Sequence, residues 1–207
     1  MKLKRAALAA GCLILAVGGC ERATTGEPIP IYDRPQVALL VVDLQKHFLD
    51  RGGRQALAPS HVAAMLAATN RLVENARSLG VELVYVRSEA PAGDGTDSRL
   101  ENPGAPVFRK QRADAFSNPE LDQFLRSRAV DHLVLAGASA EASIYYTAEG
   151  AMNRGYKVKV LGDAVAAASD ARRDHALEAL RREGAELSDS EQVLAEWVRR
   201  KKYLGSR

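Results

Sequence analysis

Short runs rich in apolar residues alternate along this chain with longer segments whose apolar positions recur at helical spacing. The runs predict strands at 37–42, 81–86, 106–109, 132–136, 157–161 and 185–187. Val37–Val42 is apolar throughout, which is typical of a strand buried on both faces of a sheet. The pattern therefore favours a sheet that is covered on both sides.

The segments between these runs predict helices. Helical patterns are expected from residue 60 to a stop at Gly80, from Asn118-Pro119, over 141–154, over 170–182, and from about 190 onward. Ser60 is the expected cap of the first helix, and Pro119 suits the first position of its helix. Alternating strands and helices predict an α/β fold of three layers: a mostly parallel sheet with helices on both faces, doubly wound in the Rossmann manner.

The amino-terminal segment has the order of a bacterial lipoprotein signal. Positive residues in Met1–Arg5 precede an apolar run of 14 residues, Ala6–Gly19, about 21 Å as a helix and short for a bilayer core of about 30 Å. The run ends in small residues before Cys20, which resembles a lipobox. A plain secretory signal cleaved elsewhere, or an uncleaved anchor, is the alternative.

Three parts of the chain are accordingly expected. Residues 1–19 are the signal peptide, residues 20–35 carry the lipidated Cys20 and a polar, proline-containing linker, and residues 36–207 form one folded domain. The protein would face the periplasm, held to a membrane through Cys20 without spanning it. Glu21 after the cysteine favours the outer membrane.

Charge and cysteine content exclude several classes of partner. The chain has 29 Lys+Arg and 26 Asp+Glu; removal of Lys2, Lys4 and Arg5 with the signal leaves 26 of each, so the mature chain is formally neutral. This balance predicts no nucleic-acid partner. Cys12 and Cys20 are the two cysteines of the whole sequence, which excludes disulfides and thiolate metal sites from the domain.

Candidate chemistry lies where the predicted strands end. Ligand sites in parallel α/β sheets lie at the carboxyl ends of the strands. Asp43 follows the first run, Lys110 follows the short run at 106–109, and a small-residue turn at 137–143 follows the run at 132–136. His132, by contrast, begins its strand and is expected at the opposite edge of the sheet.

Three motifs at these positions resemble those of the isochorismatase-like hydrolases. They are Asp43-Leu44-Gln45 with Phe48 and Gly52-Gly53; Lys110 with Ala115-Phe116; and Gly137 to Ala148, in which Ser143 stands where the family has cysteine and Thr147-Ala148 is kept. The resemblance covers roughly residues 36–197. Each motif alone is weak, but the three in this order are specific.

The resemblance implies a set of roles. The family's catalytic triad would be Asp43, Lys110 and Ser143, with a cis peptide at Ala138–Ser139 and an oxyanion hole made by the backbone N–H groups of Ser139 and Ser143. Further implied pocket residues are Phe48, Phe116 and Tyr146. A metal cluster found in one branch of the family needs histidine after the second strand; no histidine lies between Arg87 and Asp131, so neither a metal nor another cofactor is expected. A homo-oligomer is possible, as in the family.

Serine at position 143 changes the chemistry that a cysteine would perform. A thiol needs about 2 kcal/mol to ionise at pH 7, whereas an alcohol with a pKa near that of water needs on the order of 12 kcal/mol. A helix dipole contributes roughly 0.3–2 kcal/mol. Ser143 therefore needs a base that removes its proton during attack.

Three functions remain open from the sequence. The first is hydrolysis of a small amide or ester in the cell envelope, with Ser143 as nucleophile beside Asp43 and Lys110. The second is hydrolysis of a vinyl ether, with Asp43 as general acid and no nucleophile. The third is a catalytically inactive, membrane-tethered protein that binds a small molecule.

Overall fold

The computed structural model describes residues 36–49, 56–89, 97, 99–100 and 104–205. Its central element is a six-stranded parallel sheet with the strand order β3-β2-β1-β4-β5-β6. The strands are β1 (Gln36–Val42), β2 (Glu82–Ser88), β3 (Val107–Lys110), β4 (Val130–Ala138), β5 (Lys157–Ala166) and β6 (Glu186–Ser188). The signal peptide, Cys20 and the linker lie outside the described residues.

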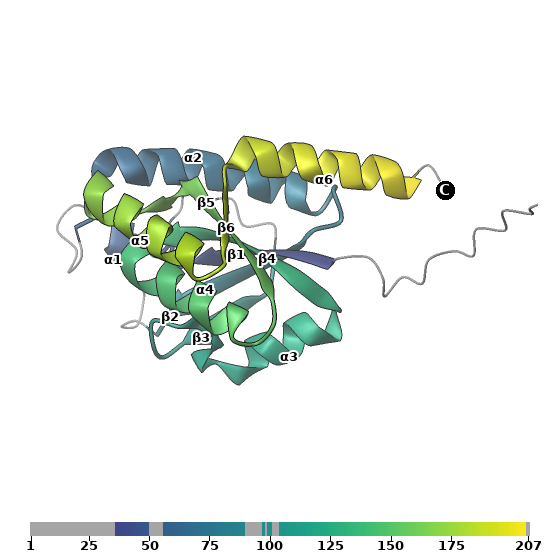
Figure 1. Ribbon diagram of the computed structural model, residues 1–207, viewed down its shortest axis with the longest axis horizontal. Coiled ribbons are helices and arrows are strands. Elements are labelled where there is room, and N and C mark those ends of the chain that lie inside the picture. The colour runs from purple at the N-terminus through teal and green to yellow at the C-terminus, as the bar shows by residue number, and fades with distance from the viewer. Residues whose placement is uncertain (1–35, 50–55, 90–96, 98, 101–103, 206–207) are drawn as a thin grey trace, which may run out of the picture.

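Helices cover both faces of this sheet (Figure 1). On one face lie α2 (Pro59–Ala76) and α6 (Ser190–Gly205); on the other lie α3 (Pro119–Ser127), α4 (Tyr145–Met152) and α5 (Asp170–Arg182). Two short elements, α1 (Lys46–Leu49) and the 3₁₀ turn Ala115–Ser117, follow β1 and β3. The three-layer α/β fold predicted from the sequence is confirmed.

Strand alternation divides the core into two apolar layers. In β1, Leu39 and Val41 pack toward α2 and α6, whereas Ala38, Leu40 and Val42 pack toward the other helices. All five are at most 1% exposed. Burial on both faces is what the continuous apolar run predicts.

The starts of two helices differ from those predicted from the sequence. Ser60 does not cap α2: the helix begins at Pro59, because proline is favoured at the first helical position, and its cap residue Ala58 makes no side-chain hydrogen bond. The helix expected over 141–154 begins with one π-helical turn, Ala140–Ile144, before α4. Hydrophobic periodicity does not reveal such a turn, because it shows which face of a helix is buried. It does not show whether each backbone N–H bonds to the carbonyl four or five residues earlier.

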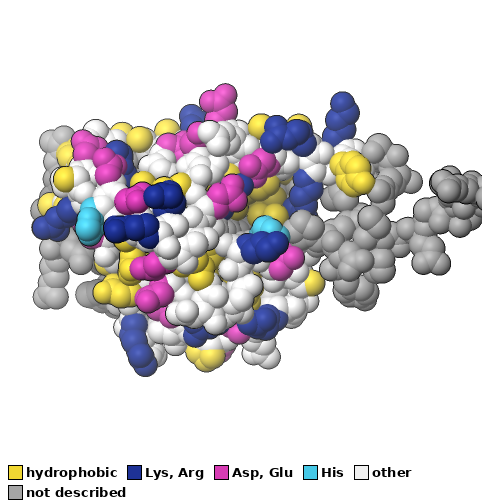
Figure 2. All heavy atoms as spheres, viewed as in Figure 1, with side chains coloured by type: hydrophobic (Ala, Val, Ile, Leu, Met, Phe, Trp, Pro, Cys, Tyr) yellow, Lys and Arg dark blue, Asp and Glu magenta, His cyan; other side chains and the backbone are white. Residues whose placement is uncertain are grey.

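The face of the molecule shown in Figure 2 is charged, with both signs present. The face in Figure 2 carries Lys/Arg and Asp/Glu side chains interspersed, with no large patch of one sign. No helix among the described residues is long and apolar enough to cross a membrane.

Candidate active site

The sheet register brings the ends of four strands to one edge. Val42 pairs with Val86 of β2 and with Gly137 of β4, and Ser88 pairs with Lys110 of β3. Asp43 comes directly after Val42. The parallel arrangement therefore places the predicted Asp43 and Lys110 beside each other, together with Ser88.

Gly137 is required for this close approach. Its φ is +130°, and a Cβ atom there would lie 2.0 Å from the carbonyl oxygen of Val42. No other residue type fits between β4 and β1 at this point. The glycine of the third motif thus has a packing function at the edge of the site.

The turn after Gly137 positions Ser143. The Ala138–Ser139 peptide is cis, as the family resemblance implies. Ser143 lies in the π-helical turn before α4, and it is 9% exposed. The hydroxyl oxygen of Ser139 is enclosed and has no hydrogen-bond partner in the structure. The backbone N–H groups expected to form the oxyanion hole lie in this turn, and their role stays a prediction.

Asp43 accepts four hydrogen bonds through its carboxylate. Oδ1 accepts from the backbone N–H and the hydroxyl of Ser88, at 2.8 and 3.0 Å. Oδ2 accepts from the Ser143 hydroxyl at 2.6 Å and pairs with Lys110 Nζ at 2.8 Å. Four donors match the acceptor sites of an ionised carboxylate, because a protonated one would carry a donor of its own. Asp43 adopts φ 54°, a left-handed conformation that aspartate tolerates better than most residues.

Lys110 is enclosed by oxygen atoms. Besides Asp43, its Nζ lies 3.0 Å from the carbonyl oxygen of Ala113 and 3.1 Å from that of Arg112. It also donates to the Ser143 hydroxyl oxygen at 3.1 Å. Lys110 is 2% exposed. An ammonium group has three donors and no acceptor, so the four oxygen atoms share its three N–H groups; this shell fits the charged amine and offers no role as a base.

Ser88 and Gln45 support the Asp43 carboxylate: Ser88 contacts it directly, and Gln45 holds Ser88. The side chain of Gln45 is 1% exposed, accepts from the Ser88 backbone N–H at 2.8 Å and donates to the Ser88 carbonyl at 3.2 Å. Sequence reasoning included Gln45 in a motif but missed Ser88. The signal for Ser88 was its place just after the second predicted strand, at the same edge as Asp43.

Asp114 borders the Lys110 loop. Burial raises the pKa of this carboxyl group above its usual value, although a hydrogen bond from the Phe116 backbone N–H offsets part of the effect. Asp114 also packs closely against Gly150 of α4, where a Cβ would lie 2.6 Å from its carboxylate.

The residues expected to form a substrate pocket are placed differently from one another. Phe116 is 4% exposed and packs in the core, stacked on Tyr156 at 5.7 Å between ring centroids. Tyr146 is 48% exposed and contacts Tyr145 edge to face. The side chain of Phe48 lies outside what the structure describes. The pocket role of all three stays a prediction. Within the described ranges, no cluster of His, Cys, Asp and Glu could hold a metal ion.

The chain resembles known hydrolases in sequence. It is 24% identical over 198 residues to a ureidoacrylate amidohydrolase of Stutzerimonas stutzeri, covering 72% of this chain and 80% of that protein. It is 30% identical over 137 residues to the streptothricin hydrolase of Streptomyces noursei, covering 61% of this chain and 48% of that protein.

Solved structures share the fold. A cysteine hydrolase from Pseudomonas syringae pv. phaseolicola superposes with a TM-score of 0.72 at 23% identity, over 78% of this chain and 92% of that one. An isochorismatase-like hydrolase from Alkaliphilus metalliredigens gives 0.71 at 20% identity, over 78% and 99% of the two chains. The isochorismatase domain model matches residues 37–192. The chain therefore belongs to the isochorismatase family.

Proposed function

We propose that this protein is a hydrolase of a small amide or ester and that Ser143 is its nucleophile. One observation carries the proposal: the Ser143 hydroxyl donates to Asp43 Oδ2 at 2.6 Å while accepting from Lys110 Nζ at 3.1 Å. A serine that lacks a base would be inert here, since ionising an alcohol at neutral pH needs on the order of 12 kcal/mol. The contact with Asp43 supplies the base during attack.

The proposed reaction has two stages. As Ser143 Oγ bonds to the carbonyl carbon of the substrate, its proton moves to Asp43 Oδ2, and the amine or alcohol then leaves with that proton. Water attacks the resulting ester and gives a proton to Asp43; the bond from the acyl carbon to Ser143 Oγ then breaks, Oγ takes that proton back from Asp43, and the acid is released. Lys110 contacts both the Asp43 carboxylate and the Ser143 hydroxyl and so keeps them together. Its positive charge stabilises the negative charge that develops on Ser143 Oγ. The N–H groups of Ser139 and Ser143 would bind the oxyanion.

The relatives support this class of reaction by name. One is an amidohydrolase and another hydrolyses streptothricin. We extend from them only the chemical class, an amide or a related acyl compound, and we propose no particular substrate.

A vinyl-ether hydrolase with Asp43 as general acid is the second candidate. It requires a protonated carboxyl group, whereas the four donors around Asp43 fit the ionised form. A protein that only binds its ligand is the third. The shared hydrogen bond between Ser143 and Asp43 favours the serine mechanism over both.

Turnover by matched variants of the full chain separates these functions. Wild type, Ser143→Ala, Ser143→Cys and Asp43→Asn are assayed on small amides, esters and vinyl ethers, with thermal unfolding as a check of folding. We expect Ser143→Ala and Asp43→Asn to lose at least about 10³-fold in kcat/KM, and Ser143→Cys to remain active. Near-normal Ser143→Ala with inactive Asp43→Asn would establish the general-acid mechanism instead. No turnover by wild type, with turnover by Ser143→Cys, would identify a binding protein.

We also propose that the enzyme works at a membrane surface in the cell envelope. The support is the order of charge, apolar run, small residues and Cys20 in the sequence. Labelling of cells with radioactive palmitate should mark the wild-type protein and not Cys20→Ala, and the wild type should fractionate with the outer membrane. Equal labelling of the two proteins would refute lipidation at Cys20.

A further inference from the structure

The opposite edge of the sheet contains a cavity, which the proposed reaction does not use. It has a volume of about 440 Å³ and lies between the amino-terminal halves of β1, β4 and β5 and helix α6. Val37, at the start of β1, lines it, whereas Asp43 follows the end of the same strand. Six residues of strand separate the two by about 20 Å, so the cavity and the proposed active site are distinct.

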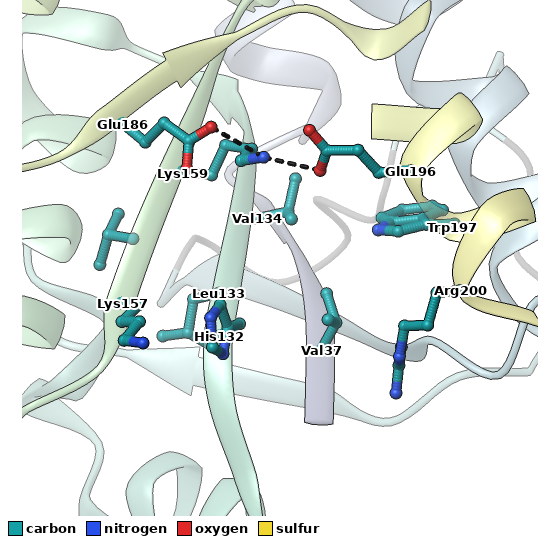
Figure 3. A pocket seen from close by; sticks show the side chains of 11 residues that line it. Val37, His132, Leu133, Val134, Lys157, Lys159, Glu186, Glu196, Trp197 and Arg200 are labelled. Carbon is teal, nitrogen blue, oxygen red and sulfur yellow. Dashed lines mark hydrogen bonds and ion pairs between the residues drawn. The ribbon is translucent and has the colours of Figure 1, made fainter. Parts of the chain in front are cut away.

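The interior of the cavity is largely apolar. Val37, Val134 and Trp197 contribute to it, and Trp197 is 3% exposed. Figure 3 shows the indole on one side of the cavity, with Val134 and Val37 from the sheet beside it. A flat apolar group matches such walls, and the volume is in the range of small-molecule sites, roughly 300–1,000 Å³.

Arg200 is the polar group without a partner in this cavity. It extends from α6 alongside Val37 (Figure 3). Its Nη1 atom is enclosed and has no hydrogen-bond partner within the part of the chain that the structure describes. Burial lowers the pKa of its guanidinium group, against the attraction of Asp131. Buried donors are nearly always paired in proteins, so the guanidinium of Arg200, which lines the cavity, lacks an acceptor that a ligand could supply once the side chain turns its donors toward the cavity.

The remaining charges of the cavity are already engaged or exposed. Lys159 pairs with Glu196 at 2.7 Å and with Glu186 at 3.0 Å (Figure 3). Burial alone would lower the pKa of Lys159, but the hydrogen bonds to these two carboxylates outweigh it and hold the pKa above its usual value. His132 pairs with Asp131 at 2.8 Å, and Lys157 is exposed at the rim. One cation, Arg200, thus faces the apolar walls without a carboxylate of its own among the described residues.

We propose that this cavity binds a small organic carboxylate, with its anionic group on Arg200 and its apolar body against Trp197 and Val37. A guanidinium presents parallel N–H donors that fit a planar carboxylate. A phosphate dianion is disfavoured, because Glu186 and Glu196 also face the cavity and repel a second negative charge. The ligand class is therefore a monoanion with a compact hydrophobic group.

The chain carries its own reporter for this site. Trp197 is the single tryptophan in the sequence, so tryptophan fluorescence reports on this one side chain, which lines the cavity. The full chain is titrated with benzoate, phenylacetate and cyclohexanecarboxylate, and equilibrium dialysis with radiolabelled benzoate measures binding directly. Neutral benzamide is the matched ligand, with the same ring and no charge.

We expect saturable binding of at least one carboxylate, and binding at least tenfold weaker for benzamide and for Arg200→Gln. Arg199→Gln removes an exposed arginine next to it on α6 and should leave the affinity unchanged. Ser143→Ala should also bind normally, which separates this site from the proposed active site.

Three results would overturn the proposal. Dialysis that shows no saturable binding of any of the three carboxylates is one. Equal affinity of wild type and Arg200→Gln is the second, because the carboxylate would then lie elsewhere. The third is a dimer that dissociates on Arg200→Gln in analytical ultracentrifugation, which would make a second copy of the chain the occupant of the cavity.

Discussion

The two edges of the sheet contain charged side chains in opposite states, buried at one edge and partly buried at the other. At the carboxyl edge, Asp43 and Lys110 are each at most 2% exposed, and protein atoms supply all the partners described above. At the amino edge, Arg200 faces an open cavity with one donor unsatisfied. A charge surrounded by its own partners is preorganised for chemistry, whereas one that lacks a partner is free to take a ligand. Whether the hydrogen bonds of a charged group are all satisfied within the protein therefore indicates its role better than the edge of the sheet at which the group lies.

The largest expected effect tests how tightly the carboxyl edge is packed. Gly137→Ala places a Cβ about 2 Å from the backbone of β1, so we expect a loss of at least about 4 kcal/mol in the free energy of unfolding, or no folded protein. Gly155→Ala, at another positive φ (86°) but with no atom within 4 Å of the new Cβ, should cost about 1–2 kcal/mol. Urea unfolding measures both. Equal losses would mean that backbone conformation alone, and not close approach, makes Gly137 necessary.

Removing one member of the buried ion pair is the next largest change. Lys110→Met leaves the Asp43 carboxylate enclosed without its cation, which should cost about 3 kcal/mol or more in stability. Arg200→Met at the other edge removes a donor that has no partner, so it should be neutral or slightly stabilising. Urea unfolding at pH 7 compares the two. A large loss for Arg200→Met would show that its guanidinium is already satisfied within the protein.

Ser88→Ala removes one of the hydrogen bonds that support Asp43 and should have a smaller effect on stability. It removes the hydroxyl donor to Oδ1 and leaves the backbone donor, so we expect a loss of about 1–2 kcal/mol in stability. If Asp43 acts as the base, kcat should fall while KM stays constant, and Ser88→Thr should restore kcat. Ser127→Ala removes an exposed hydroxyl that donates to the Phe124 carbonyl, and should change stability by about 0.5 kcal/mol or less. A kcat that does not respond to Ser88→Ala would remove Ser88 from the positioning of Asp43.

The smallest effect is a pH dependence at Asp114. Its carboxyl pKa is raised above 3.8 in the folded protein because burial penalises the charged form. The stability linked to this group is therefore present at pH values below 3.8 and is lost as the pH rises through the folded pKa. The difference in unfolding free energy between wild type and Asp114→Asn should decline over that window and be flat above it. A difference that rises with pH would reverse the assigned direction.

The sequence predicted the fold because strand and helix periodicities are local. It also placed Asp43, Lys110 and the 137–143 turn at one edge, since parallel strands bring their carboxyl ends together. Elements without a strong period were missed, among them the π-helical turn before α4 and the short helix α1. Strand β5 also runs to Ala166 and not to residue 161; the polar and glycine positions after Leu161 hide its continuation.

By itself the sequence determined the fold class and the edge of the sheet at which the chemistry-bearing residues lie. Only the tertiary structure decided the direction of the hydrogen bond from Ser143 to Asp43, the four donors around that carboxylate and the contact of Ser88 with it. It alone decided that α6 lies against the amino edge and leaves Arg200 facing a cavity. The physical reason is that periodicity encodes which face a residue occupies, whereas hydrogen-bond partners depend on where segments distant in the chain come to lie within a few tenths of an ångström.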